Sequence, residues 1–276
     1  MPILHAIVLG IAQGLTEFLP VSSSGHLALV PWLFDWNDFA DDDVEKAFDV
    51  AIHIGTLVAV AWYFRADLRR FVADGARALV DRHNPTDEGR MAWLLVLASV
   101  PAAVVGFTLD STLDRLDDEI WLVALMLIVF GLVLAAADRL PVQRSSESFR
   151  ARDALAMGLG QAAALQPGVS RSGVTISVAR GLGFDRDAAA RISFLMTLPV
   201  IAGAGLFQLV DIGGFDGIPS DLRWPFAVGM MTSAITGWVA VWGTLRLVRT
   251  RTFDAFVVYR VVVGVAVLAL LASSFR

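Results

Sequence analysis

The chain has 276 residues, of which 56% are hydrophobic and only 18% are charged, and its formal net charge is −5. A soluble domain would carry about 25% charged residues, so the composition excludes an ordinary soluble protein and indicates a membrane protein. The acidic balance argues against nucleic-acid binding, which would need a basic face, and the absence of Cys excludes disulfides.

The first polar group of the chain lies within an apolar segment that covers about residues 1–34. Gln13 and Glu17 are four residues apart, so they lie one above the other on a helix face. Glu17 has apolar neighbours, and a carboxylate there must be paired, metal-bound or protonated. Ser23 and His26 follow closely. Glu, Ser and His together can form a nucleophile with its base or a metal-assisted hydrolytic site, although each residue alone would more often be structural.

Six apolar runs are long enough to cross a hydrocarbon core, which takes about 20 helical residues. In chain order they cover approximately 48–64, 91–109, 119–137, 191–210, 224–246 and 256–275. We therefore predict six membrane-spanning helices.

Charge sorts the loops between these runs into two groups. The Arg-rich loops are 65–90, 138–153 and 246–251, and the acidic loops are 35–46, 110–119 and 211–223. Because basic loops stay on the cytoplasmic side, we expect the first group to face the cytoplasm and the second group to face outward.

If the loops face these two sides, two further segments, 1–34 and 153–182, must each enter and leave the membrane on the same side. Both are interrupted by helix breakers, namely Pro20, Gly25, Pro167, Gly168 and Gly173. Irregular backbone at membrane depth persists only where it is buried in protein or lines a wet cavity. We predict two re-entrant pairs of short helices, whose N-terminal N–H groups meet around one point and suit an anion such as phosphate.

The second polar motif consists of Ser170, Arg171, Ser172, Gly173 and Thr175. Hydroxyls and a glycine-opened backbone at a helix start can donate to oxyanions, and Arg171 adds a permanent charge and a fork that fits two phosphate oxygens. The motif therefore predicts a phosphate site. The plainer interpretation is that the serines cap a helix and that Arg171 snorkels toward an interface.

The two motifs are copies of one unit, related by a register of 148 residues without a gap. Gly10, Gln13, Val21, Ser22, Ser24 and Gly25 match Gly158, Gln161, Val169, Ser170, Ser172 and Gly173. Combined with the loop charges, this register predicts an inverted-topology repeat. We expect an all-α integral membrane protein that is a single membrane domain over 1–276, with repeat one at about 1–140 and repeat two at about 150–276.

Three other polar residues of the apolar runs receive structural interpretations. His53 is expected to serve helix packing or hydrogen bonding. Arg191 and Arg260 stand near predicted span ends, and we expect both to snorkel, although Arg260 could help to neutralise the site.

The two motifs resemble the signatures of the undecaprenyl-diphosphate phosphatase family, also known for bacitracin resistance. The similarity is carried by Gln13-Gly14-Leu15-Thr16-Glu17-Phe18-Leu19-Pro20-Val21-Ser22-Ser23-Ser24-Gly25-His26 and by Pro167-Gly168-Val169-Ser170-Arg171-Ser172-Gly173-Val174-Thr175. It covers essentially the whole chain. It implies a membrane hydrolase that removes the terminal phosphate from undecaprenyl diphosphate, so that the lipid carrier of cell-wall precursors is recycled.

The resemblance also implies roles for individual residues. Glu17, Ser23, His26 and Arg171 would be catalytic, with Ser23 as nucleophile and His26 as general base. The residues implied to bind the diphosphate are Ser22, Ser170, Arg171, Ser172, Gly173 and Thr175. Glu17, with Gln13 beside it, would hold a divalent cation, Mg²⁺ or Ca²⁺.

Other functions stay open at this stage. An inverted repeat is also a transporter architecture, which keeps a polyprenyl-phosphate flippase as the alternative. A carrier, however, has no use for Glu, Ser and His at reacting distance from a phosphate clamp, and the cost of burying Glu17 and Arg171 argues against a purely structural protein. The expected partners are the polyprenyl diphosphate lipid and the bilayer, and a homodimer is left open. The resemblance implies a multi-pass protein of the plasma membrane whose active site faces outward.

Overall fold

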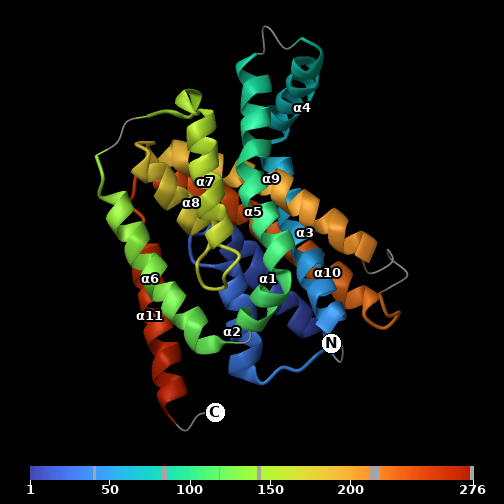
Figure 1. The fold of residues 1–276 in the computed structure, drawn as a ribbon. Coiled ribbons are helices and arrows are strands. Elements are labelled where there is room, and N and C mark those ends of the chain that lie inside the picture. Colours follow the sequence, from blue (N-terminus) through green and yellow to red (C-terminus); the bar gives the residue numbers. More distant parts are fainter. Residues whose placement is uncertain (40–41, 82–85, 118, 142–143, 212–217, 274–276) are drawn as a thin grey trace.

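The structure is a computed structural model that describes residues 1–39, 42–81, 86–117, 119–141, 144–211 and 218–273. The described chain is helical, and Figure 1 shows its arrangement. Its helices are α1 (Ile3–Phe18), α2 (Ser23–Phe34), α3 (Asp42–Tyr63), α4 (Arg65–Val80), α5 (Asp87–Asp117), α6 (Ile120–Asp138), η1 (Ser146–Ser148), α7 (Ala151–Ala163), α8 (Arg171–Gly181), α9 (Arg186–Asp211), α10 (Arg223–Val248) and α11 (Asp254–Ala272). The predicted all-α class is confirmed.

Five of the described helices are long and apolar enough to cross a membrane, namely α5, α6, α9, α10 and α11. A sixth candidate span is α3 together with α4, which follows it after a bend of 87°. Every predicted apolar run therefore corresponds to a helix, and the protein is a multi-pass membrane protein.

The two predicted re-entrant segments each form a pair of short helices. α1 and α2 have 16 and 12 residues, and α7 and α8 have 13 and 11. All four are shorter than the roughly 20 residues that a span requires. None of the four is therefore long enough to cross a membrane by itself.

Contacts at the ends of the pairs show that each enters and leaves at one end of the molecule. Next to the start of α1, His5 Nδ1 lies 2.7 Å from the Asp38 carboxylate, which follows α2. Before α7, Arg144 pairs its backbone with residues 183 and 185, which follow α8. In Figure 1 the termini lie at the lower end and α4 at the upper end, and α7 and α8 approach from that upper end.

The Arg-rich loops gather at this upper end. Asp138 at the end of α6 accepts from Arg186 Nε at 2.6 Å and from the Phe253 backbone N–H at 3.0 Å, which ties three connections together. A cavity of about 650 Å³ lies among them, and none of its lining residues belongs to either polar motif. The predicted grouping of the basic loops on one side is therefore present in the fold.

Two predicted loops differ from the structure. The Arg-rich loop 65–90 contains α4, because its charges recur at helical spacing while Phe71 packs against the main hydrophobic core. Trp93 Nε1 donates to the Gly75 carbonyl at 3.0 Å and fastens α4 to α5. α5 itself continues to Asp117, beyond the predicted end of its apolar run. Within the three acidic loops, residues 40–41, 118 and 212–217 lie outside the described part.

Helices from the two halves of the chain pack on each other. α10 lies against α1 and α3, whereas α5 lies against α7 and α9. The matched glycines explain the close approach: a Cβ on Gly10 would lie 2.5 Å from the Gly229 carbonyl, and a Cβ on Gly158 would lie 2.5 Å from the Ala98 carbonyl. Small residues permit such contacts between membrane helices. The division into halves at about 140–150 stays a prediction.

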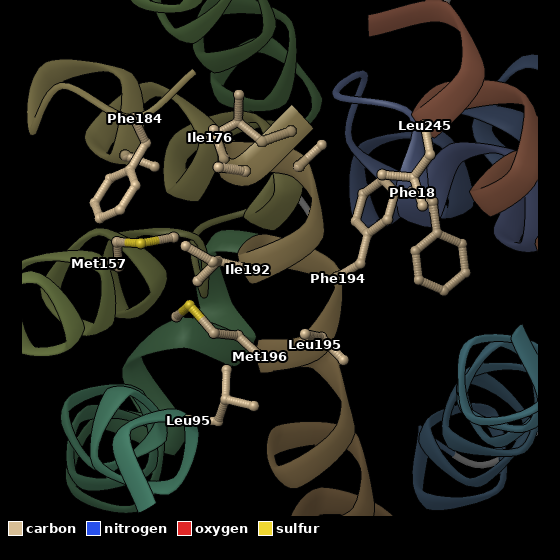
Figure 2. Packing of buried hydrophobic residues seen from close by; sticks show 14 of the residues in the cluster. Phe18, Leu95, Met157, Ile176, Phe184, Ile192, Phe194, Leu195, Met196 and Leu245 are labelled. Atoms are coloured by element: carbon tan, nitrogen blue, oxygen red, sulfur yellow. The ribbon is translucent and has the colours of Figure 1, made fainter. Parts of the chain in front are cut away.

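The main hydrophobic core lies where α9 meets α1, α7 and α8, as Figure 2 shows. Phe18 of α1 and Phe194 of α9 pack edge to face, with ring centroids 5.3 Å apart. Lipid tails are as apolar as these side chains, so packing rather than exclusion from water holds them together. This contact fixes the end of α1 that carries Glu17.

Candidate active site

The two motif turns have the same backbone conformation. Ser22 has φ 76° and ψ 98°, and Ser170 has φ 73° and ψ 109°. Positive φ is uncommon for residues other than glycine. Each serine caps its helix, because its Oγ accepts from the backbone N–H of Gly25 at 3.2 Å or of Gly173 at 3.1 Å. The equivalence expected from the 148-residue register is thus visible at the start of α2 and of α8.

Glu17 lies at the point where the two turns meet. Its carboxylate is buried and accepts hydrogen bonds from three donors. Gln13 Nε2 and Ser23 Oγ donate to Oε2 at 3.0 and 2.6 Å, and Arg171 Nη2 donates to Oε1 at 2.9 Å. Of the paired, metal-bound and protonated states that the sequence left open for this carboxylate, the structure shows the paired one, with donors from α1, α2 and α8.

Ser23 and Arg171 are equivalent residues of the two copies, each being the first residue of its helix. Both donate to the same carboxylate from opposite sides. The repeat thus brings a hydroxyl and a guanidinium to one glutamate, with Ser23 Oγ hydrogen-bonded to a group that can accept its proton. Arg171 also donates through Nη1 to the Ser193 carbonyl at 3.2 Å, so it does not snorkel as the plainer interpretation of the motif would have it.

The remaining residues of the second motif make contacts within the protein. Ser172 Oγ donates to the Leu19 carbonyl at 3.2 Å and so links the two turns. Thr175 Oγ1 lies 2.7 Å from Ser193 Oγ. Ser170, Ser172 and Thr175 are all buried. Their hydroxyls would have to exchange these partners to reach a phosphate, whereas Ser23 and Arg171 already converge on one point.

His26 does not contact Glu17 or Ser23 through a hydrogen bond in this structure. Its Nδ1 lies 2.6 Å from the Ser22 carbonyl oxygen, and its Nε2 lies 2.6 Å from the Tyr259 hydroxyl. The group that accepts from Ser23 is Glu17. The general-base role that the resemblance assigned to His26 therefore has no direct geometric counterpart here.

A second histidine, His53 of α3, lies nearer to the carboxylate than the sequence indicated. Its Nε2 is 3.8 Å from Glu17 Oε2, and its Nδ1 donates to the Asp49 carbonyl at 2.7 Å. The sequence feature that could have pointed to His53 is its position as a polar residue inside an apolar span. The expected role in packing or hydrogen bonding agrees with the bond to Asp49, but the sequence does not show which helix face meets α1.

The expected snorkelling of Arg260 is wrong. Arg260 is fully buried and donates to carbonyls of both motif turns, at Pro20, Gly168 and Val169, over 3.2, 2.8 and 3.0 Å. A buried guanidinium needs several acceptors, and these helix-free turns offer carbonyls without partners. Arg191 does not snorkel freely either, because it donates to Asp67 Oδ2 at 3.1 Å.

The residues around Glu17 meet one requirement of a divalent cation. Gln13 Oε1 is a buried oxygen without a hydrogen-bond partner, and Mg²⁺ and Ca²⁺ prefer oxygen ligands. Among the described residues, no group of three His, Cys, Asp or Glu is arranged for a metal ion. Gln13 and Glu17 therefore fit a cation that takes its other ligands from a bound diphosphate and water, as Mg²⁺ commonly does.

The fold and the site define an all-helical membrane protein, with a buried Glu–Ser–Arg cluster where its two pairs of short helices meet. The family model described as Bacitracin resistance protein BacA matches residues 6–266. The chain belongs to this family.

Curated relatives match over nearly their whole length. The undecaprenyl-diphosphatase of Pelotomaculum thermopropionicum is 43% identical over 274 residues, covering 99% of this chain and 98% of the relative. The undecaprenyl-diphosphatase of Geobacter sulfurreducens is 44% identical over 273 residues, covering 98% and 99%. That of Nocardioides sp. is 44% identical over 276 residues, covering 98% and 97%.

Proposed function

We propose that this protein is an undecaprenyl-diphosphatase, a membrane hydrolase that converts undecaprenyl diphosphate into undecaprenyl phosphate and inorganic phosphate. The family and the names of the curated relatives support this activity. The observation that carries it is the 2.6 Å hydrogen bond from Ser23 Oγ to Glu17 Oε2, with Arg171 on the other carboxylate oxygen. A hydroxyl, a base and a fixed cation are the groups that phosphoryl transfer requires.

In the proposed reaction Ser23 Oγ attacks the terminal phosphorus while its proton passes to Glu17 Oε2. The bond between that phosphorus and the bridging oxygen breaks, and undecaprenyl phosphate leaves. The departing phosphate oxygen takes the proton from Glu17, which restores the carboxylate. Water then attacks the phosphoserine while one of its protons passes to Glu17. The bond between phosphorus and Ser23 Oγ breaks, inorganic phosphate leaves, and Oγ regains its proton from Glu17. Ser23 is suited to this role because its hydroxyl is only partly buried while its proton acceptor is fixed.

Arg171 has two roles in this proposal. Without substrate it neutralises the buried Glu17 carboxylate at 2.9 Å. The terminal phosphate competes for the same guanidinium fork. When Arg171 turns to the phosphate, Glu17 loses its charged partner and becomes a stronger base at the moment when Ser23 must lose a proton.

Gln13 and Glu17 would hold the divalent cation, Mg²⁺ or Ca²⁺, through amide and carboxylate oxygens. When bound, such a cation screens the negative charge of the diphosphate and of the transferring phosphoryl group. Ser22, Ser170, Ser172, Gly173 and Thr175 shape the turns that position Ser23 and Arg171. His26 of α2 supports the first turn through the Ser22 carbonyl and also contacts Tyr259 of α11.

We place the protein in the plasma membrane with its active site facing outward. Support comes from the Arg-rich connections, which gather at the end opposite to the termini and which basic loops keep in the cytoplasm. The pair that carries Glu17, Ser23 and His26 enters from the end of the termini. The reacting groups would then be reached from outside, with the lipid tail leaving sideways between helices.

The test is phosphate release from undecaprenyl diphosphate by the purified protein in detergent. We expect one phosphate per lipid, and loss of nearly all turnover in Ser23→Ala. The matched control is Ser99→Ala, whose hydroxyl only bonds the Leu95 carbonyl within α5, and it should retain turnover. A wild-type protein that binds the lipid but releases no phosphate would favour a flippase and overturn the proposal.

A further inference from the structure

His26 is held between a carbonyl and a tyrosine. Its Nδ1 lies 2.6 Å from the Ser22 carbonyl oxygen and its Nε2 lies 2.6 Å from the Tyr259 hydroxyl. The two rings also stack, with centroids 5.6 Å apart and planes 9° apart. The tautomer with its proton on Nδ1 fits both contacts, because Nδ1–H donates to the carbonyl oxygen and Nε2 accepts a hydrogen bond from the tyrosine hydroxyl.

This contact belongs to the first motif alone. The residue equivalent to His26 in the second motif is Val174, which reaches the Ser170 carbonyl only with its backbone N–H, at 2.9 Å. α11 therefore constrains the turn at Ser22 through Tyr259 and His26. The turn at Ser170 has no such contact at the equivalent position, Val174. The neighbouring Arg260 of the same helix holds carbonyls of both turns.

The constraint acts on a strained backbone. Ser22 has φ 76°, a conformation that costs a non-glycine residue energy and persists only when its surroundings enforce it. The His26 Nδ1–H bond to the Ser22 carbonyl is one such enforcing contact. Ser23 is the next residue, so the orientation of its hydroxyl toward Glu17 depends on this turn.

We propose that Tyr259 is a positioning residue of the diphosphatase site. Its hydroxyl occupies His26 Nε2, which keeps the ring proton on Nδ1, and the Nδ1–H in turn holds the Ser22 turn that presents Ser23. The inference rests on the proposed function. It differs from a packing role, because a phenylalanine would keep the ring stack and lose only the hydroxyl.

The first measurement compares Tyr259→Phe with Tyr63→Phe, the two tyrosines of the chain. Tyr63 packs edge to face on Phe64, away from the motifs, so its variant should match wild type. Losing one hydrogen bond should lower kcat of Tyr259→Phe roughly fivefold to tenfold. KM should stay within about twofold, because substrate-binding groups are untouched.

The second measurement reads the tautomer directly by ¹⁵N NMR of histidine-labelled protein, with the His26 signal identified by its loss in His26→Gln. Wild type should show the Nδ1–H form of His26. Tyr259→Phe should show a mixture of both tautomers. An unchanged tautomer, or an unchanged kcat, in Tyr259→Phe would each overturn the inference. A wild-type protein without diphosphatase activity would instead refute the proposed function, and the NMR result would still stand.

Discussion

The Glu17 carboxylate is the central group of the site, because side chains of three helices donate hydrogen bonds to it. Gln13 and Ser23 share Oε2, and Arg171 takes Oε1. Breaking a buried ion pair by removing one partner costs about 3–5 kcal/mol, because the other charge is left uncompensated. Replacements at Glu17 or Arg171 should therefore keep size and hydrogen-bonding capacity, so that effects on activity can be separated from effects on folding.

Arg171→Lys is expected to lower kcat/KM roughly 100-fold, in the range found for losing one transition-state donor. Lysine keeps the charge beside Glu17, so the fold should persist. Its ammonium lacks the planar fork that contacts Glu17 and the Ser193 carbonyl together. Steady-state phosphate release checks this, and near-normal turnover would show that Arg171 only anchors α8.

The meeting of Glu17, Ser23 and Arg171 could be predicted from the sequence, because the repeat places Ser23 and Arg171 at equivalent helix starts. The contributions of His53, Tyr259 and Arg260 could not. Each lies on a long apolar helix, where the sequence gives the depth of a residue but not the direction of its side chain. That direction depends on the packing of α3 and α11 against the motif turns.

At the scale of elements, close helix pairs add to the ion pairs that join distant parts of the chain. α1 meets α10 at Gly10, and α7 meets α5 at Gly158. The two contacts are equivalent under the repeat. Gly10 and Gly158 each lie on the first helix of a re-entrant pair. Their close contacts therefore set the position of each motif turn relative to the neighbouring helix.

Gly10→Ala and Gly158→Ala should each destabilise the protein by about 1–3 kcal/mol, since the added methyl would overpack a backbone contact. The matched control is Gly243→Ala. A Cβ at Gly243 meets nothing within 4 Å, and this variant should be neutral or stabilised by about 0.5–1 kcal/mol. Thermal unfolding in detergent measures all three. Equal stability of Gly10→Ala and Gly243→Ala would contradict the packing described.

The sequence predicted the order of helices well because hydropathy and helix breakers act locally. The sequence analysis did not predict α4. The six arginines of residues 65–90 indicate a solvated loop unless their helical spacing is considered. The predicted end of the apolar run at 109 agrees with the end of the candidate span at Leu109, whereas the loop expected from 110 is helical. The polar residues beyond 109 end the apolar pattern, yet the helix itself continues to Asp117.

At the scale of the molecule, the fold separates two chemically different ends. The Arg-rich connections of α6, α9, α10 and α11 meet at one end, and the termini lie at the other. In the proposed orientation the end with the Arg-rich connections faces the cytoplasm, because basic loops are retained there. The Ser23 turn would then be reached from outside.

Single cysteines test this orientation, since the natural chain has none. In right-side-out vesicles, a membrane-impermeant thiol reagent should label Ser24→Cys beside the reacting turn, and undecaprenyl diphosphate should block the labelling. Thr252→Cys lies exposed between α10 and α11, and it should react only after permeabilisation. The reverse pattern would invert the topology and the access route together.

The most direct test of the central claim is the rate of phosphate release from undecaprenyl diphosphate by purified Glu17→Gln. Glutamine fills the same volume and can still bond Ser23 and Arg171, but it cannot take a proton. We expect kcat to fall roughly 100- to 10,000-fold, as for loss of a general base. The variant should still unfold cooperatively, at a lower temperature than wild type because Arg171 loses its charged partner. Glu119→Gln, which changes only a surface carboxylate beside Trp121, should behave as wild type. Wild-type turnover by a folded Glu17→Gln protein would contradict the account.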